Sequence, residues 1–157
     1  MTPSNEETAA DRRKLTMRVR MSPYTGPTTN ISQRVTLGAA PHVIYETLLD
    51  AKKHSALTGE PVEIGHDTGD PVRLGGGETS GFVMELLEDR HIVFALCSSD
   101  DRWPAKHYST ATFMLRPEGK GTTMVLFEQD VPADLADEVA DRWQRGLLQN
   151  LETAFPL

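Results

Sequence analysis

Residues 133–155 read ADLADEVADRWQRGLLQNLETAF, and this stretch decides the fold of the chain. Its apolar residues recur every three or four positions, which is the period of one face of an α-helix. The apolar stripe comprises Ala136, Val139, Ala140, Trp143, Leu147, Leu151 and Ala154. Pro132 and Asp134 stand at its start, where a fixed φ angle and an acidic side chain both favour a helix N-terminus. At about 1.5 Å per residue, the predicted helix is long enough to lie across an entire sheet.

Ahead of this helix, residues 31–37 alternate apolar and polar side chains, which is the pattern of a strand with one buried face. Pro41 suits the first turn of a helix over 41–49, because that position leaves the missing N–H unused. A second helix over 51–57 is expected to end at Gly59, which adopts the left-handed cap conformation. Further strands are expected at 62–65, 71–74, 81–87, 91–98, 107–117 and 122–131, with a glycine hairpin at 75–77. This order predicts an α+β layer fold with an antiparallel meander.

The chain has 157 residues, a formal net charge of −7 and a single cysteine. That length allows one domain, which buries enough surface to need no disulfide or structural metal. We expect this domain to cover residues 29–157. Residues 1–28 are rich in turn residues and mildly basic, so we expect a partly disordered extension there, with a short helix or strand near 14–20.

Composition also excludes several classes of partner. The acidic balance argues against nucleic acid, since neutralising phosphates needs clustered Lys and Arg. No apolar run approaches the ~20 residues that span a bilayer, and the first ten residues lack the pattern of a signal peptide, so a reducing cytoplasm is the expected compartment. The histidines show no i, i+4 pairing and no neighbouring cysteine, so we expect no metal site and no cofactor. Small molecules and other proteins remain as partners.

Four groups of residues carry a resemblance to a known family. They are Arg90-His91-Ile92-Val93, the run from Trp103 to Ser109, Gly121-Thr122-Thr123, and Val131-Pro132 followed by residues 142–146. With these groups in this order and spacing, the chain resembles the activator of Hsp90 ATPase homologue 1-like family of the START-like (SRPBCC, helix-grip) superfamily over residues 31–157. The resemblance implies a curved antiparallel sheet of about seven strands around the long C-terminal helix, with two short helices after the first strand. It also implies an apolar cavity between the sheet and that helix.

The chain departs from the family pattern at two places. Leu96-Cys97 stand near the end of the fifth strand, where the family often has a Trp-Arg pair, and the usual Gly-Gly-x-Phe hairpin reads Gly69-Asp70-Pro71-Val72. Both changes remove aromatic volume. The floor of the cavity is therefore either wider than in relatives or repacked.

Strand parity and the helical stripe select the side chains that would face the cavity. They are Phe94, Leu96, Trp103, His107, Ser109, Phe113, Met124, Leu126, Glu128, Trp143 and Leu147. Inward-facing Met124 and Leu126 turn Glu128 inward as well, although Val125 and Phe127 support the opposite parity. Apolar residues at such spacing are more often plain core than ligand contacts. A single helix over a broad curved sheet, however, leaves a concave volume that a ligand can occupy.

Glu128 is the most unusual of these residues, because an ionised carboxylate on an apolar face costs several kcal/mol or raises its pKa unless a partner satisfies it. His107 on the neighbouring strand is a candidate partner. The pair would then form a polar anchor for a ligand hydroxyl or carbonyl, or an acid–base pair. Alternatively, Glu128 lies near the strand end and meets water. Trp103 is either a lid over the cavity mouth or a residue that anchors its own loop.

The sequence thus favours non-catalytic binding of a small hydrophobic ligand, lipid-like or aromatic, in the cavity. One alternative is a co-chaperone-like or stress-response module that binds a chaperone or another protein through its sheet. A second is a cyclase- or hydrolase-like enzyme with His107 and Glu128 as acid and base. An exposed sheet edge allows either a monomer or a homodimer.

Overall fold

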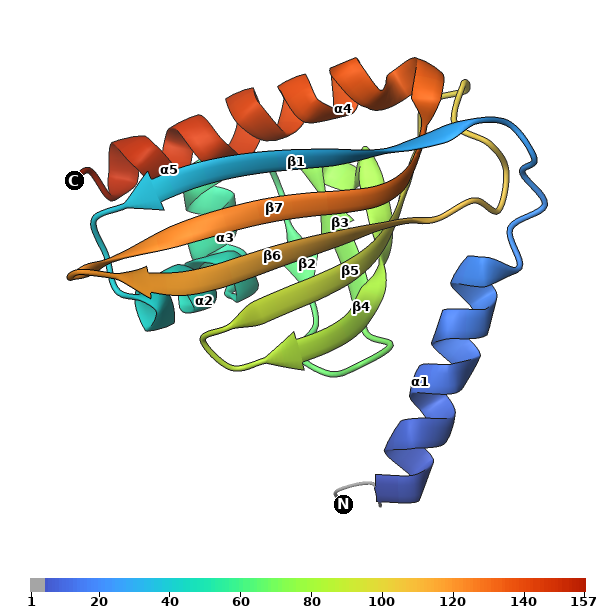
Figure 1. Ribbon diagram of the computed structural model, residues 1–157, viewed down its shortest axis with the longest axis horizontal. Helices are drawn as coiled ribbons and strands as arrows, with labels where there is room; N and C mark the ends of the chain where they lie inside the picture. The colour runs from blue at the N-terminus through green and yellow to red at the C-terminus, as the bar shows by residue number, and fades with distance from the viewer. Residues whose placement is uncertain (1–4) are drawn as a thin grey trace.

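The computed structural model describes residues 5–157 and contains a seven-stranded antiparallel sheet (Figure 1). Its strands are β1 (Thr28–Leu37), β2 (Glu63–Ile64), β3 (Pro71–Leu74), β4 (Thr79–Leu87), β5 (His91–Ser98), β6 (Ser109–Glu118) and β7 (Gly121–Pro132). They lie in the order β1-β7-β6-β5-β4-β3-β2, so the first strand pairs with the last and the others form a meander. The predicted α+β helix-grip architecture is confirmed.

The helices are α1 (Asn5–Arg20), α2 (Pro41–Leu49), α3 (Ala51–Thr58), α4 (Ala136–Trp143) and α5 (Gln149–Ala154). The sequence determines how α2 and α3 meet, because Asp50 ends the first and its side chain accepts the backbone N–H of Lys53 in the second, at 2.9 Å. Gly59 ends α3 in the left-handed conformation, with φ 76°. Both predicted helix ends are confirmed.

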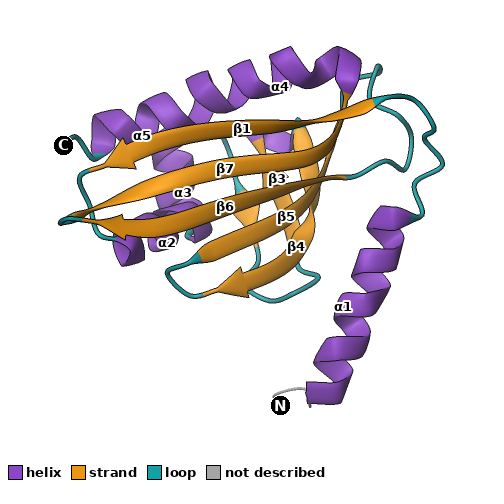
Figure 2. Ribbon diagram, in the orientation of Figure 1, coloured by secondary structure: helices purple, strands orange, loops and turns teal. Residues whose placement is uncertain are grey.

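The C-terminal helical segment runs alongside β1 (Figure 2). A short 3-10 turn over Ala133–Leu135 precedes it, and a π-helical turn over Gln144–Leu148 joins α4 to α5. The expectation of one regular α-helix over 133–155 is therefore wrong in detail. A π turn contains one residue more than an α-helical turn. Here it allows the adjacent side chains of Leu147 and Leu148 both to be buried.

The core lies between the inner face of the sheet and the helices. Its largest fully buried side chains include Phe94, Phe113, Leu37, Ile44, Ile92, Met124 and Leu126. The predicted strand parity is confirmed, since Met124, Leu126 and Glu128 are buried whereas Val125 and Phe127 are only half-buried. The glycine hairpin expected at 75–77 is confirmed, because β3 and β4 pair antiparallel on either side of it, with Leu74 opposite Thr79, and its turn is a 3-10 turn. One local expectation differs: β6 begins at Ser109, so His107 lies outside it.

α1 extends away from the sheet and is held to it near β4 (Figure 1). The Arg18 guanidinium donates to the hydroxyl of Tyr108 at 2.8 Å and lies 4.9 Å from the ring centre of Phe82. Within residues 5–157, no helix combines the length and the apolar character needed to cross a membrane. The expectations for residues 1–28 fall partly on residues 1–4, outside the described residues, and the division of the chain into extension and domain stays a prediction.

Candidate functional site

A cavity of about 190 Å³ lies between the sheet and the C-terminal helical segment. Its walls come from the ends of β3 to β7, from α3, and from α4 with the π turn. The side chains and backbone that line it include His54, Thr58, Val62, Leu74, Glu78, Thr79, Leu96, Ser98, Trp103, Ser109, Glu128, Val139, Arg142, Trp143, Gly146 and Leu147. The lining is mostly apolar, with polar groups at a few positions.

The cavity exists because the inward side chains become small along β6 and at the end of β5, toward this end of the sheet. In β6 the inward series runs Phe113, Ala111, Ser109. In the paired strand β5 it ends at Ser98, which lies opposite Thr79 of β4. Small side chains that face the C-terminal helical segment leave volume that no protein atom fills, whereas a close-packed core has no such volume.

Glu128 forms the polar floor of the cavity and is only 2% exposed. Its carboxylate accepts the indole N–H of Trp143 at 2.8 Å, and the Ser109 hydroxyl is a further hydrogen-bond partner. That hydroxyl has one hydrogen and also reaches the Leu96 carbonyl oxygen at 3.3 Å, so it donates to one of the two at a time. Burial raises the pKa of Glu128, against the opposing effects of Trp143, Ser109 and the charge of Arg142.

His54 of α3 supplies a second buried polar group in the lining of the cavity. Its Nδ1 lies 2.9 Å from the carbonyl oxygen of Leu48, so Nδ1 carries the hydrogen and donates it. Burial lowers the pKa of His54, which keeps the ring neutral. The other nitrogen, Nε2, is then a hydrogen-bond acceptor, and it has no partner among the described residues.

Charged residues surround the mouth of the cavity. Arg142 pairs with Glu78 at 3.3 Å across it. Arg102 bridges Asp100 in its own loop, at 2.8 Å, and Glu138 of α4, at 2.6 Å. The hydrogen bonds from Arg102 lower the pKa of Asp100 to about 2. These pairs join the loop that carries Trp103 to the helix above the cavity.

The structure brings six of the predicted site residues to the cavity: Leu96, Trp103, Ser109, Glu128, Trp143 and Leu147. Four others, Phe94, Phe113, Met124 and Leu126, are buried in the packed core beside it, where Phe113 contacts Phe94 and Trp143 edge to face. Sequence reasoning missed His54 and Arg142. A signal for the hollow was present in the shrinking inward series of β6. Arg142 belongs to a motif of the family resemblance but was not assigned to the cavity, and no motif included His54.

His107 lies apart from the cavity, so its predicted pairing with Glu128 is wrong. Its Nε2 lies 2.6 Å from the carbonyl oxygen of Asp130, and its Nδ1 lies 2.8 Å from the hydroxyl of Ser22. β6 begins only at Ser109, so His107 lies two residues before the strand and beyond the end of the sheet. The Trp103 indole donates to the His107 carbonyl oxygen at 2.8 Å, so Trp103 both anchors its loop and lines the cavity.

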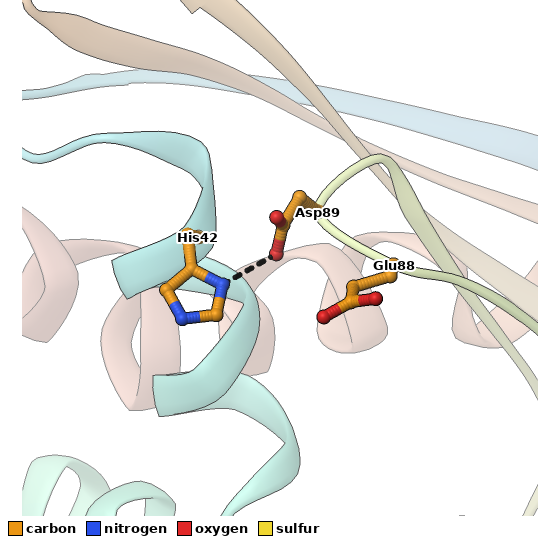
Figure 3. A group of neighbouring side chains, drawn as sticks. All are labelled: His42, Glu88 and Asp89. Carbon is orange, nitrogen blue, oxygen red and sulfur yellow. Dashed lines mark hydrogen bonds and ion pairs between the residues drawn. The ribbon is translucent and has the colours of Figure 1, made fainter.

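A separate group on the surface joins His42 of α2 to Glu88 and Asp89 in the β4–β5 turn (Figure 3). Nδ1 of His42 lies 2.8 Å from Asp89, and Nε2 lies 3.1 Å from Glu46. The hydrogen bond to Asp89 and the nearby negative charges raise the pKa of His42. Both ring nitrogens of His42 lie at hydrogen-bond distance from carboxylates, so this group is a polar cluster that joins α2 to the β4–β5 turn.

Fold and site together define a helix-grip module with a partly apolar cavity beneath its C-terminal helix. A family model described as activator of Hsp90 ATPase homolog 1-like protein matches residues 38–155, and the chain belongs to this family. It is 23% identical over 129 residues to the human protein called activator of 90 kDa heat shock protein ATPase homolog 1, covering 82% of this chain but 38% of that protein. The chain thus spans less than half the length of that curated relative.

Crystal and solution structures of similar proteins share the fold. A Plasmodium falciparum protein described as an HSP90 activator is similar with a TM-score of 0.75 and 20% identity, over 81% of this chain and 97% of that one. The Aha1 dimer from Colwellia psychrerythraea is similar with a TM-score of 0.68 and 16% identity, over 82% and 97% of the two chains. At these identities the likeness concerns the fold.

Proposed function

We propose that this protein binds a small hydrophobic molecule, without chemical turnover, in the cavity between the sheet and the C-terminal helical segment. The observation that carries the proposal is the size of the cavity, about 190 Å³. An engineered apolar cavity of roughly 150 Å³ is enough to bind benzene. A void of this kind leaves its walls without partner atoms, so a ligand that fills it regains the lost dispersion contacts.

The absence of turnover is supported by the positions of the two candidate acid–base groups. Glu128 lies in the cavity, whereas His107 is held outside it by Ser22 and the Asp130 carbonyl. An enzyme that used both residues on one substrate would need them within reach of the same atom. A cytoplasmic location remains a prediction.

The test is to block the cavity without disturbing the rest of the sheet. Thr79 lines the cavity and its side chain has no hydrogen-bond partner among the described residues, so Thr79→Trp places an indole in the void. A Cβ built on Gly146 meets nothing within 4 Å, which makes Gly146→Leu a second blocking variant from the helix side. Thr36→Trp, at an exposed position of β1, is the matched control.

Native mass spectrometry of the purified wild type should detect a co-purified small molecule, and isothermal titration calorimetry should detect binding of propylbenzene. Both signals should disappear in the two blocking variants and persist in Thr36→Trp. Propylbenzene that binds the blocked variants as well as the wild type would place the ligand elsewhere. A wild type that binds neither propylbenzene nor a co-purified molecule would overturn the proposal.

A second candidate is regulation of an Hsp90-type chaperone, which membership of the family favours. The human relative named for that activity is matched over 38% of its length, so the role proposed here is one for the helix-grip module. Titration of the purified chain into an Hsp90 ATPase assay tests this role. Unchanged ATPase turnover at saturating protein would exclude it.

A further inference from the structure

We propose that the ligand of this cavity carries a hydroxyl group on a single ring, as in a small phenol, and that Glu128 and His54 bind that hydroxyl. This inference rests on the proposed function and specifies its ligand class. Three observations carry it: the size of the void, the two buried polar groups in its walls, and the kind of hydrogen bond that those groups leave open.

The size of the cavity limits the ligand to one ring with a short substituent. The volume of about 190 Å³ exceeds the roughly 150 Å³ that accommodates benzene by about the volume of a small alkyl group. A fused polycyclic molecule or a long acyl chain would have to extend out through the mouth or displace the side chains of Leu96, Trp143 or Leu147, which the packed core supports from behind.

The two polar groups in the walls retain unused hydrogen-bonding capacity. A carboxyl group has about four lone-pair sites, and the protein supplies Glu128 with two partners, Trp143 and Ser109. The Nε2 atom of His54 has none among the described residues. Both side chains line the cavity and are only 2% and 3% exposed, so the space in front of them is suited to a polar atom of the ligand.

A hydroxyl is the ligand group that fits both walls. It donates to the His54 lone pair or to an ionised Glu128, and it accepts from Glu128 when that carboxyl is protonated. A ligand carboxylate meets a lone pair at His54 and repulsion from an ionised Glu128. A ligand ammonium would lose its hydration in a mostly apolar void that already lies near the positive charge of Arg142.

Four probes of similar shape separate these possibilities: 4-propylphenol, its methyl ether 4-propylanisole, 4-propylbenzoate and 4-propylbenzylamine. We expect calorimetry on the full chain to give a dissociation constant for 4-propylphenol at least about 10-fold lower than for 4-propylanisole, and weaker binding still for the two charged probes. A hydrogen bond to a buried acceptor is worth a factor of this order.

The residues are tested by variants that keep the fold-supporting contacts. His54→Asn can retain the N–H donated to the Leu48 carbonyl and removes the free nitrogen, while Glu128→Gln removes the charge and keeps one acceptor. Each should lower the preference for the phenol over the anisole at least about 3-fold and leave anisole binding unchanged. His66→Asn is the matched control, because His66 is exposed and does not line the cavity. This variant should leave the preference for the phenol over the anisole unchanged.

The location of the phenol has its own readout. The chain has two tryptophans, so the indole N–H region of a nitrogen-correlated NMR spectrum contains two signals. Because the Trp143 indole donates to Glu128, its signal should shift with the phenol more than with the anisole. Equal affinities for phenol and anisole, or tighter binding of the benzoate or the benzylamine, would overturn the hydroxyl inference while leaving the proposed function in place. Failure of all four probes and of propylbenzene to bind would overturn both.

Discussion

The inner face of the sheet has two halves that differ in how they meet the helix. In the packed half, Ile92, Phe113 and Leu126 lie side by side on neighbouring strands and are at most 1% exposed. In the hollow half, Ser98 and Ser109 occupy the same inward face and leave a cavity. The same strands build both halves, so the difference lies only in the side chains at successive inward positions.

This comparison shows why a carboxyl group is tolerated at the edge of the hollow half. Glu128 stands two residues along β7 from Leu126, at the border between the halves. In the packed half its carboxyl would have no room for a partner. At the border it meets the Trp143 indole on one side and open volume on the other. The folded chain keeps a costly buried carboxyl where a ligand can reach it.

The largest expected difference between the halves concerns one pair of leucines. Leu126→Ala creates a new void in close-packed surroundings and should lower the free energy of unfolding by about 4–5 kcal/mol. Leu96→Ala removes the same atoms from the wall of an existing cavity, and should cost about 2–3 kcal/mol. Urea denaturation measures both. Equal costs would mean that the cavity is closed in solution.

Trp143→Phe should cause the next largest decrease in the free energy of unfolding. It removes the N–H that the Glu128 carboxyl accepts at 2.8 Å, while the smaller ring can keep its contact with Phe113. Loss of a hydrogen bond to a buried charged group should cost about 1.5–3 kcal/mol in urea denaturation at neutral pH. The cost should shrink in the Glu128→Gln background, and an unchanged cost there would assign the effect to packing alone.

A smaller, pH-dependent effect should come from Glu128→Gln. Burial raises the folded-state pKa of Glu128 above the ordinary 4.5, so between those two values the folded chain binds more protons than the unfolded chain. The wild type therefore loses stability as pH rises through this window, by about 1.4 kcal/mol for each unit that separates the two pKa values. The variant lacks this loss.

Urea denaturation of both proteins from about pH 4 to pH 8 tests the sign. The stability of the variant relative to the wild type should increase from pH 4.5 upward and then level off above the folded-state pKa. A relative stability that falls with rising pH would show that the carboxylate is net stabilised in the folded chain, and that its partners outweigh its burial.

The inward positions of the sheet and of the last helix could largely be predicted from the sequence, because they depend on the alternation of residues along a strand and on the helical period. The alternation in β7 placed Glu128 on the same face as Met124 and Leu126, and the stripe in the last helix placed Trp143 toward the sheet. The helix ends at Asp50 and Gly59 followed from local backbone chemistry. Such features are set by residues within a few positions of one another.

The rest depends on contacts between distant segments. His107 shares the parity of Ser109, yet β6 begins at Ser109, and its neighbours come from Ser22 and Asp130. His54 faces the cavity only because α3 folds back against the C-terminal segment, which no spacing in the sequence indicates. The π turn likewise arises where the helix must bury Leu147 and Leu148 together.

The smallest expected effect separates the exposed rim of the hollow half from its buried floor. Arg102→Gln removes the side-chain hydrogen bonds that are the largest cause of the lowered pKa of Asp100, about 2, and keeps the backbone N–H of residue 102, so this pKa should rise part of the way toward 3.8 in a carbon-detected NMR titration. The paired Asp100 favours folding at pH values above 3.8 and loses this contribution as pH falls toward 2. Arg102 is exposed and Asp100 is half-buried, so water screens the pair. The urea midpoint at neutral pH should therefore stay unchanged, as it should in the control Arg73→Gln, which removes the exposed pair with Glu63. A lowered midpoint in Arg102→Gln alone would show that the ion pairs of the loop that carries Trp103 stabilise the fold. The exposed rim of the cavity would then contribute to the free energy of unfolding, as the buried floor at Glu128 does.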